Sequence, residues 1–284
     1  MNNIHSLSVS NIKQETLNSV VISFKIPSSL KNQYAFKAGQ YLTLSSNIKG
    51  EKVKRSYSIC SSPQSQDLQV GVKAIENGVF SNYVNDALRE GDSIEVSVPE
   101  GRFVLEDNPS ANYCAFVAGS GITPLMSLVS DVLAKNETGV FVLGYGNKTK
   151  ASTMFTGAIE ELKSIYPKRF YCYNIYSKEN NPEATFGRID SDFISYILKQ
   201  HLETKFEKIL LCGPEKMIET SKETLKKANY PEDKVLYELF YSKPVSKKND
   251  KGSGSSAKII YDEETLDLDI PEKMTILDAA LQKN

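Results

Sequence analysis

The sequence has 284 residues, enough for two domains of ordinary size, and this length excludes a small fold held together by disulfides. Its 34 Lys and Arg residues almost balance 35 Asp and Glu residues, and a net charge of −1 argues against nucleic acid or an anionic membrane as the main partner. With 40% apolar and 24% charged residues, no apolar run of transmembrane length and no signal segment, the composition predicts a soluble, cytoplasmic globular protein.

The cysteines and histidines do not form a recognisable metal or hydrolase pattern. Cys60, Cys114, Cys172 and Cys212 lie far apart, with no Cys-x-x-Cys pair and no neighbouring His. We therefore expect reduced thiols and no metal site within this chain. Because only 2 histidines occur, Ser-His-Asp and Cys-His hydrolases are disfavoured, and chemistry that depends on a bound cofactor is expected.

Up to about residue 107 the sequence predicts many short strands joined by turns, which is typical of a small antiparallel barrel. The clearest strand is Leu68–Ala74, where apolar residues alternate with polar or small ones. One helix, Ser81–Leu88, is expected between the strands, with Ser81 as its N-cap. The other predicted strands are Leu7–Ile12, Val20–Ile26, Tyr41–Leu44, Ser56–Cys60, Ile94–Val98 and Phe103–Leu105.

After Asn108-Pro109 the pattern changes to apolar strands that alternate with amphipathic helices. This alternation predicts a five-stranded parallel sheet covered by helices on both faces, an architecture typical of nucleotide binding. The predicted strands are Cys114–Ala118, Val140–Tyr145, Phe170–Tyr176, Lys208–Cys212 and Lys234–Phe240. The predicted helices are Pro124–Ala134, Gly157–Ile165, Asp192–Lys199 and Pro214–Ala228.

Residues 241–256 are rich in Gly, Ser, Lys and Pro and contain little to bury, so a flexible linker is predicted there. Beyond it, Lys258–Tyr261 and Thr265–Ile270 predict a hairpin, and Thr275–Gln282 predicts the start of a helix. Such a tail is too small for a core of its own and is interpreted as an incomplete domain. The predicted domains are therefore residues 1–107, 108–240 and 257–284.

Two motifs in the first domain have the chemistry of a flavin dinucleotide site. Arg55-Ser56-Tyr57-Ser58 combines a guanidinium for phosphate, a ring for stacking and a hydroxyl for a ring nitrogen, although an exposed Arg beside a core Tyr is the simpler alternative. Gly78-Val79-Phe80-Ser81 leads into the predicted helix and offers backbone amides to a pyrophosphate. Its alternative is an ordinary helix cap.

A third motif, Gly119-Ser120-Gly121-Ile122-Thr123-Pro124, follows a predicted strand and opens a helix. Glycines allow close approach of the backbone, and the amides of the helix start would face a phosphate. Pro124 suits the first helical turn, where its missing N–H would have no partner. The alternative is a tight turn between strand and helix that binds nothing.

Together with Cys212-Gly213-Pro214 and Glu238-Leu239-Phe240, these motifs, in this order, resemble the ferredoxin-NADP reductase superfamily over about residues 1–240. The resemblance implies an N-terminal antiparallel FAD-binding barrel, an NAD(P)-binding α/β domain, and hydride transfer from nicotinamide C4 to flavin N5. It implies that FAD is held by Arg55, Tyr57, Ser58, Gly78, Ser81 and Phe240. It implies that the nicotinamide nucleotide is held by Gly119, Gly121, Thr123, Pro124, Gly213 and Pro214. The residues that it implies to be catalytic are Ser58, Cys212 and Glu238, although Cys212 could equally be a small core thiol.

The choice between NADPH and NADH depends on residues around the adenosine ribose, after the second parallel strand. In the run Gly144–Ser152 we expect Lys148, Lys150 and Ser152 to favour the 2′-phosphate of NADPH, with no Asp or Glu opposing them. The alternative is that these lysines are solvated loop charges, which would leave NADH as the donor.

The tail resembles the start of a plant-type ferredoxin domain, as in reductases of oxygenase systems such as phenylacetyl-CoA epoxidase of phenylacetate degradation. The sequence ends at Asn284, before the cysteine loop of such a domain, so the 2Fe-2S cluster expected of the complete parent protein has no ligands here and a shortened chain or gene fragment is expected. The implied function is an NAD(P)H-dependent FAD oxidoreductase that passes single electrons through a ferredoxin-type module to an oxygenase component. The alternatives are a stand-alone reductase of ferredoxin or flavin, and a non-catalytic FAD-binding subunit.

Overall fold

The computed structural model describes residues 3–65, 67–240, 255–261, 264–270, 274–276 and 279. The chain forms two compact units, Met1–Tyr241 and Ser242–Asn284. Residues 241–254 of the predicted linker lie outside the described residues, so the linker and the exact division of the chain into domains stay predictions.

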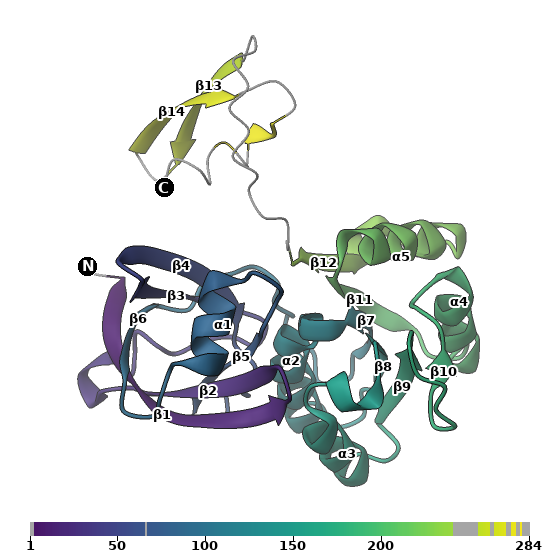
Figure 1. The fold of residues 1–284 in the computed structure, drawn as a ribbon. Helices are drawn as coiled ribbons and strands as arrows, with labels where there is room; N and C mark the ends of the chain where they lie inside the picture. Colours follow the sequence, from purple (N-terminus) through teal and green to yellow (C-terminus); the bar gives the residue numbers. More distant parts are fainter. Residues whose placement is uncertain are drawn as a thin grey trace. The chain divides into compact units, whose positions relative to one another are not determined.

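The N-terminal half of the first unit is an antiparallel sheet with the strand order β4-β3-β6-β1-β2-β5 (Figure 1). An isolated bridge between Ile59 and Val70 joins the chain after β4 to β5 and so curls the sheet towards a barrel. Inside it lies a cluster of buried aliphatic and aromatic side chains. The strands are β1 Ile4–Thr16, β2 Ser19–Lys25, β3 Tyr41–Ile48, β4 Glu51–Ser58, β5 Leu68–Lys73 and β6 Ser93–Ser97.

Two predictions in this half are wrong. The helix α1 spans Val79–Asp86 with Gly78 at its N-cap, so Ser81 lies inside the helix, where its Oγ accepts a hydrogen bond from the Ile75 N–H at 3.3 Å. Residues 103–105 form no strand, because the Phe103 side chain leaves the barrel and is buried against the second sheet. Ser81 is engaged by the loop before the helix, and Phe103 by a tertiary contact that overrides its local pattern.

The second half of the first unit is a parallel sheet with the order β10-β9-β8-β7-β11-β12. Five of its strands confirm the predicted ones, and β10, Thr185–Phe186, was missed because 2 exposed residues leave no pattern to detect. The remaining strands are β7 Asn112–Ala118, β8 Phe141–Asn147, β9 Phe170–Tyr176, β11 Phe206–Gly213 and β12 Val235–Leu239.

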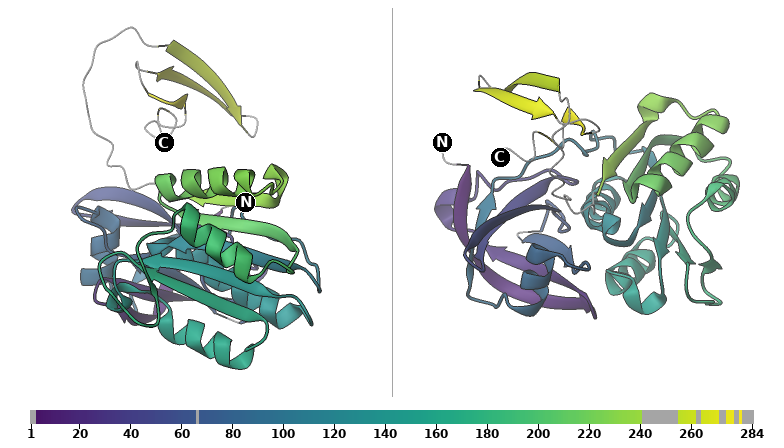
Figure 2. Two further views of the ribbon diagram at one scale, coloured as in Figure 1. Left: turned by 90° about the vertical axis from the view of Figure 1, so that its right-hand side faces the viewer. Right: turned by 45° about the horizontal axis from the view of Figure 1, so that its top comes forward.

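Helices cover both faces of this sheet, because successive residues of its strands alternate between two apolar clusters (Figure 2). Ala115 and Val117 of β7 face the helices α2 and α3, whereas Cys114 and Phe116 face α4 and α5. The bounds are α2 Ile122–Lys135, α3 Thr156–Ile165, α4 Ser191–Gln200 and α5 Glu215–Lys227, close to the predicted ones. Short 3₁₀ turns occur at η1 Ser28–Leu30, η2 Gly119–Gly121, η3 Lys150–Ser152 and η4 Glu232–Lys234.

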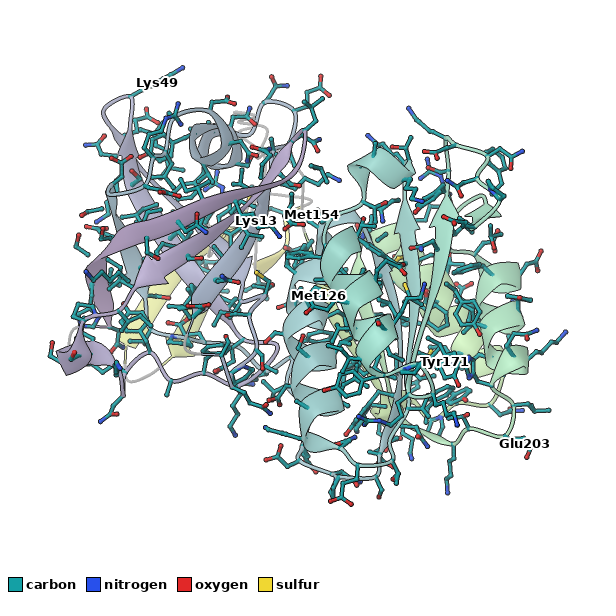
Figure 3. All side chains as sticks on the ribbon, turned by 90° about the horizontal axis from the view of Figure 1, so that it is seen from below. Lys13, Lys49, Met126, Met154, Tyr171 and Glu203 are labelled. Atoms are coloured by element: carbon teal, nitrogen blue, oxygen red, sulfur yellow. The ribbon has the colours of Figure 1, made fainter. Side chains whose placement is uncertain are left out.

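The barrel and the parallel sheet share one apolar seam. Cys60 of the barrel lies in the same buried cluster as Met126 and Met154, which Figure 3 shows on the side that faces the barrel. The Ser127 hydroxyl of α2 donates a hydrogen bond of 2.6 Å to the Ser61 carbonyl. The two sheets therefore form one packed body in which residues of both can build a single site.

The second unit contains the predicted hairpin, formed by β13 Ser255–Tyr261 and β14 Glu264–Ile270 in antiparallel register. A hydrogen bond from the Ala279 N–H to the Thr275 carbonyl marks a helical turn, while the rest of the predicted helix lies outside the described residues. Within the described part of the chain, no helix is long and apolar enough to span a membrane, and no group of His, Cys, Asp and Glu is arranged to hold a metal ion.

Candidate functional site

Ser58, Cys212 and Glu238, the three residues expected to be catalytic, meet where the barrel faces the parallel sheet. Cys212 of β11 and Glu238 of β12 are register partners on neighbouring strands. Ser58 is the last residue of β4 in the barrel, and its side chain forms a hydrogen bond with the Glu238 carboxylate. The fold thus brings Ser58 together with two residues that lie more than 150 positions further along the chain.

Burial sets the protonation state of this junction. It raises the pKa of Glu238 to about 7, and hydrogen bonding with Ser58 opposes this rise. The Oε2 atom of Glu238 is buried and has no hydrogen-bond partner among the described residues. Burial and the nearby Glu238 charge also raise the pKa of the Cys212 thiol well above its usual value, so that the thiol is neutral. Glu238 can therefore gain or lose a proton near neutral pH, whereas Cys212 cannot act as a thiolate.

A cavity of about 250 Å³ borders Glu238, between β12 and the segment that follows the last barrel strand, β6. It is lined by Arg102, Phe103, Leu236, Tyr237 and Glu238. The cavity gives the buried carboxylate an opening at the seam between the two sheets.

The Arg-Ser-Tyr-Ser motif lies next to the start of helix α1. The Tyr57 ring packs against the Phe80 ring of the Gly-Val-Phe-Ser motif, with 5.8 Å between centroids. Burial raises the pKa of the Tyr57 hydroxyl, and the charge of Arg55 lowers it. Arg55 itself is exposed and donates to the Lys54 carbonyl at 2.6 Å, so its guanidinium lies at the surface beside the tyrosine. The two motifs that the sequence suggested for FAD are therefore adjacent.

Position 78, the N-cap of α1, favours glycine because a Cβ there would overlap the side chains of Ser81 and Ile75. The first amides of a helix have no partner within it, and those of α1 begin at Val79. The Ser81 hydroxyl accepts from Ile75, and its own proton remains available for donation. This turn can therefore donate hydrogen bonds to a phosphate.

The glycine turn after β7 packs directly on the Cys212-Gly213 turn. Gly119 has φ +56°, and a Cβ on Gly121 would overlap the Cys212 carbonyl oxygen. Gly213 has φ +152°, and a Cβ there would lie 3.2 Å from the Ala118 nitrogen. Both turns thus need glycine, for conformation or for close approach. Pro214 is the N-cap of α5.

Thr123 and Pro124 are buried in the first turn of α2. The Thr123 hydroxyl donates to the Ser120 carbonyl at 3.0 Å, which fixes the shape of the turn. Phe240, the last residue assigned to FAD, packs against the apolar cluster that both sheets share. These three side chains are thus mainly engaged with the protein itself.

The expectation that no acidic residue opposes the lysines of this run is wrong for Lys150. The Lys150 ammonium forms an ion pair of 2.8 Å with Glu183, and its backbone N–H donates to Glu179 at 2.8 Å. Both glutamates lie between β9 and β10, a segment that folds back beside η3 and could not be placed from the sequence. Ser152 is also engaged, in a capping box with Thr149.

Sequence reasoning missed Lys73 and Asn147. Lys73, at the end of β5, donates from Nζ to the Ser152 carbonyl at 3.1 Å, and its pKa is lowered first by burial and then by the charge of Lys148. The Asn147 Nδ2 atom is buried without a hydrogen-bond partner in the described part of the chain. No signal in the sequence singled out Lys73, because it occupies one of the polar positions of the alternating strand, where an exposed lysine is the ordinary expectation.

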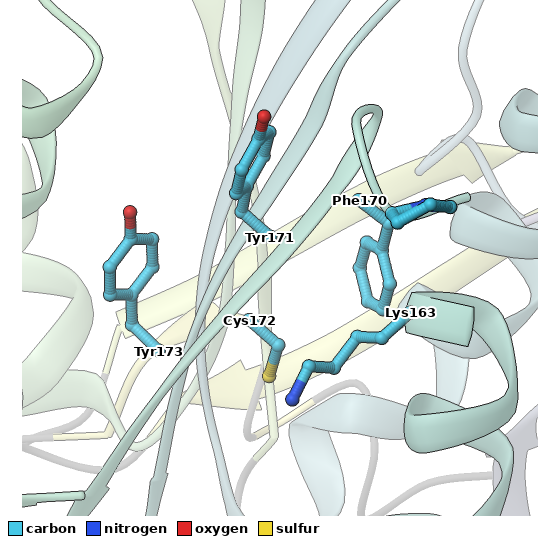
Figure 4. A pocket seen from close by; sticks show the side chains of 6 residues that line it. Lys163, Phe170, Tyr171, Cys172 and Tyr173 are labelled. Carbon is cyan, nitrogen blue, oxygen red and sulfur yellow. The ribbon is translucent and has the colours of Figure 1, made fainter. Parts of the chain in front are cut away.

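A second cavity, of about 380 Å³, lies at β9 and contains none of the expected site residues. Figure 4 shows Cys172 and Lys163 on the opposite side of β9 from Tyr171 and Tyr173. Burial raises the pKa of the Cys172 thiol to about 12, so this cavity offers no reactive thiolate. We therefore place the functional site at the seam between the sheets.

Comparisons with known proteins identify the two halves of the first unit. Residues 6–105 match the family of oxidoreductase FAD-binding domains, and residues 116–223 match that of oxidoreductase NAD-binding domains. The chain is 33% identical to one of the subunits of 1,2-phenylacetyl-CoA epoxidase from Escherichia coli, over 100% of this chain and 82% of the relative. It is 29% identical to the ferredoxin reductase component of 3-ketosteroid-9-alpha-monooxygenase of Rhodococcus rhodochrous, over 98% and 79%.

The fold is that of solved ferredoxin-NADP reductases. The structure of such a reductase from Neisseria gonorrhoeae, with bound FAD and NADP, superposes with a TM-score of 0.72 at 19% identity, and the match covers 84% of this chain and 99% of that one. By the two family matches, the antiparallel half of the first unit is an FAD-binding domain and the parallel half an NAD(P)H-binding domain. The chain belongs to the ferredoxin-NADP reductase-like superfamily of flavin-dependent NAD(P)H oxidoreductases.

Proposed function

We propose that this chain is the reductase of an oxygenase of the phenylacetyl-CoA epoxidase type. It would take a hydride from NADPH and pass single electrons through a 2Fe-2S ferredoxin-type module to the oxygenase component. The observation that carries this proposal is the extent of the similarity, because the match to the epoxidase protein covers 100% of the chain, including the hairpin beyond residue 254. The relatives named as steroid monooxygenase reductase components support the same class of partner.

The residues at the seam fit an FAD. The amides that begin α1 and the nearby Arg55 suit its pyrophosphate, and the half-buried Tyr57 ring offers a flat surface for its isoalloxazine. The unpartnered Oε2 of Glu238 and the hydroxyl of Ser58 supply polar atoms for the ring edge. When bound, FAD accepts two electrons as a hydride and releases them one at a time.

The protein's own part in the reaction is to orient the two rings and to manage protons. The glycine turn and the Cys212-Gly213 turn would hold the nicotinamide end, with the neutral Cys212 as a compact, uncharged neighbour of C4. Glu238, with a pKa of about 7, would hold or release a proton at the seam. Water would be excluded by the apolar cluster that the two sheets share.

For the nucleotide we propose NADPH over NADH, chiefly through Lys148. Lys150 is neutralised by Glu183, whereas Lys148 is exposed and close enough to Lys73 to lower its pKa. Two neighbouring cations suit a 2′-phosphate. All four cysteines are free thiols, which supports a reducing compartment such as the cytoplasm.

The test is to reconstitute the purified chain with FAD and to mix it anaerobically with each nucleotide in a stopped-flow spectrometer. We expect flavin absorbance that bleaches faster with NADPH than with NADH. A chain that fails to bind FAD, or that binds it and is bleached by neither nucleotide, contradicts the proposal and favours a non-catalytic subunit. A second assay measures oxygenation by a phenylacetyl-CoA epoxidase that lacks its own reductase, with this chain and a 2Fe-2S ferredoxin added. Turnover supports the relay to an oxygenase, and reduction of the ferredoxin without oxygenation favours a stand-alone reductase.

A further inference from the structure

Two barrel side chains of opposite charge bind the backbone of the segment that follows the proposed ribose-binding run. The Glu15 Oε2 atom, near the end of β1, accepts a hydrogen bond of 3.0 Å from the Phe155 N–H. Lys73, at the end of β5, donates from Nζ to the Ser152 carbonyl at 3.1 Å. These partners are 140 and 79 positions apart in the sequence, and both contacts join the barrel to the parallel sheet.

The charges match the backbone groups that they contact. Phe155 is the N-cap of α3, where amides lack helical partners and the helix dipole favours an anion such as the Glu15 carboxylate. The Glu15 side chain is only 9% exposed, so water competes weakly for this bond. No side chain of α3 itself caps this end. The barrel therefore supplies the cap that the helix lacks.

Phe155 also has an unusual conformation that its surroundings must maintain. Its φ is +60°, in the left-handed region that bulky residues seldom adopt. Its ring is buried against β5 of the barrel, where a Cβ on Gly71 would lie 3.2 Å from it. The barrel thus holds both the amide and the ring of this residue.

The same segment is linked to the glycine turn. The hydroxyl of the fully buried Tyr145 lies 3.4 Å from the Met154 carbonyl and 3.2 Å from the Gly119 carbonyl. A displacement of residues 152–155 would therefore move both the ribose-binding run before it and the turn proposed to hold the nicotinamide nucleotide.

We propose that Glu15, together with Lys73, clamps residues 152–155 to the barrel and so positions bound NAD(P)H for hydride transfer. Glu15 is a positioning residue here, since it contacts backbone and not the reacting atoms. The inference rests on the proposed function, in which the barrel holds the flavin and the parallel sheet the nucleotide. The distance between the two rings then depends on how the sheets are fixed, and a misplacement of about 1 Å can slow such a reaction about a hundredfold.

The test uses the FAD-loaded full chain and three variants, Glu15→Ala, Glu15→Gln and Lys13→Ala. Lys13 is the control because its ammonium, on a side chain 68% exposed, pairs with the other carboxylate oxygen of Glu15 at 2.8 Å and leaves the Phe155 bond intact. Anaerobic stopped-flow mixing with NADPH gives the limiting rate of flavin reduction, the Kd for NADPH and the charge-transfer absorbance of the stacked rings. Hydrogen exchange at the Phe155 amide reports the clamp without any need for activity.

For Glu15→Ala we expect the limiting rate to fall about tenfold or more, with weaker charge-transfer absorbance, while FAD stays bound and the Kd for NADPH changes by less than about threefold. Glu15→Gln should recover most of the rate, because its amide oxygen still accepts from Phe155, and Lys13→Ala should stay within about twofold of the parent rate. The Phe155 amide should exchange faster in Glu15→Ala only.

The clamp is overturned if Glu15→Ala keeps the parent rate and exchange, if Glu15→Gln fails as badly as Glu15→Ala, or if Lys13→Ala fails equally. A parent protein that neither nucleotide reduces would instead defeat the proposed function. In that case the exchange measurement would still decide whether Glu15 holds the segment.

Discussion

Cys212 and Glu238 are register partners on the neighbouring strands β11 and β12. Burial sets the protonation state of the Cys212 thiol and of the Glu238 carboxyl group. The carboxylate charge helps to keep the thiol protonated, and burial keeps much of the carboxylate protonated near neutral pH. An acid whose pKa lies near the working pH is suited to proton transfer, and such groups gather at functional sites. We therefore propose that the reacting groups meet at the end of β11 and β12, where this pair lies.

The first prediction concerns Glu238 and the pH dependence of stability. Its pKa is raised from 4.5 to about 7 on folding, so the folded state binds the proton more tightly. Below pH 4.5 this group costs no stability; the cost grows between pH 4.5 and about 7, where the unfolded chain releases the proton and the folded chain keeps it, and it levels off above pH 7. The free energy of unfolding of Glu238→Gln should therefore exceed that of the parent by about 3 kcal/mol near pH 8.5, and by less than about 1 kcal/mol near pH 5.

Urea denaturation at the two pH values measures this difference. The control is Glu203→Gln, which changes an exposed carboxylate far from the site in sequence and should shift the unfolding free energy by less than about 0.5 kcal/mol at either pH. An equal gain for Glu238→Gln at both pH values would show that the gain comes from packing and not from ionisation.

The second prediction concerns the contact between the glycine turn and β11. A Cβ on Gly121 would overlap the Cys212 carbonyl oxygen, which belongs to a buried backbone and cannot move aside. Gly121→Ala should therefore lower the free energy of unfolding by about 2–4 kcal/mol and reduce nucleotide binding, since the turn would be displaced. Thermal unfolding and NADPH titration measure both effects.

Gly157→Ala is the matched control for this prediction. Gly157 lies in the first turn of α3, and a Cβ there meets nothing within 4 Å. This substitution should stabilise the protein by about 0.5–1 kcal/mol, because alanine favours the helix. If both substitutions had the same effect, close approach would not be the role of Gly121.

Local patterns in the sequence suffice to predict an element where burial imposes a regular period on its residues. Strands such as β5 and β7 could be predicted because burial on one or both faces leaves a clear pattern in the residues. Phe103 misled, since an apolar run was taken for a strand although its side chain is buried in the neighbouring domain. The motif order predicted that Ser58 and Glu238 serve one site, and the structure brings them together.

Contacts between distant loops could not be predicted in this way. The pairing of Lys150 with Glu183 depends on how the β9–β10 segment folds back, and one sequence carries no periodic signal for it. The bond between Glu15 and Phe155 likewise joins a strand end to a helix start across two domains. Such polar contacts depend on the packed tertiary structure and appear only once the sheets are placed.

The third prediction concerns Tyr57 and FAD. Its ring is half buried and packs against Phe80, which leaves a rigid aromatic surface beside the amides that begin α1. Tyr57→Ala should weaken FAD binding by about tenfold or more, because the stacking surface is lost, whereas Tyr57→Phe should stay within about threefold. Fluorescence titration of the apoprotein with FAD measures both values. Equal affinity in all three proteins would show that Tyr57 only fills the barrel core.

The fourth prediction distinguishes the two lysines of the proposed ribose-binding run. Lys148→Ala should raise the Kd for NADPH by about tenfold, the cost of about one charge-assisted hydrogen bond, and should leave the Kd for NADH within about twofold. Lys150→Ala should affect NADPH much less, since Glu183 already pairs with Lys150. Both lysines are exposed, so neither substitution is expected to disturb folding. Stopped-flow reduction at varied nucleotide concentration gives all four constants.

Equal losses for NADPH and NADH in Lys148→Ala would mean that Lys148 contacts a part shared by both nucleotides, such as the pyrophosphate, and that the 2′-phosphate is recognised elsewhere.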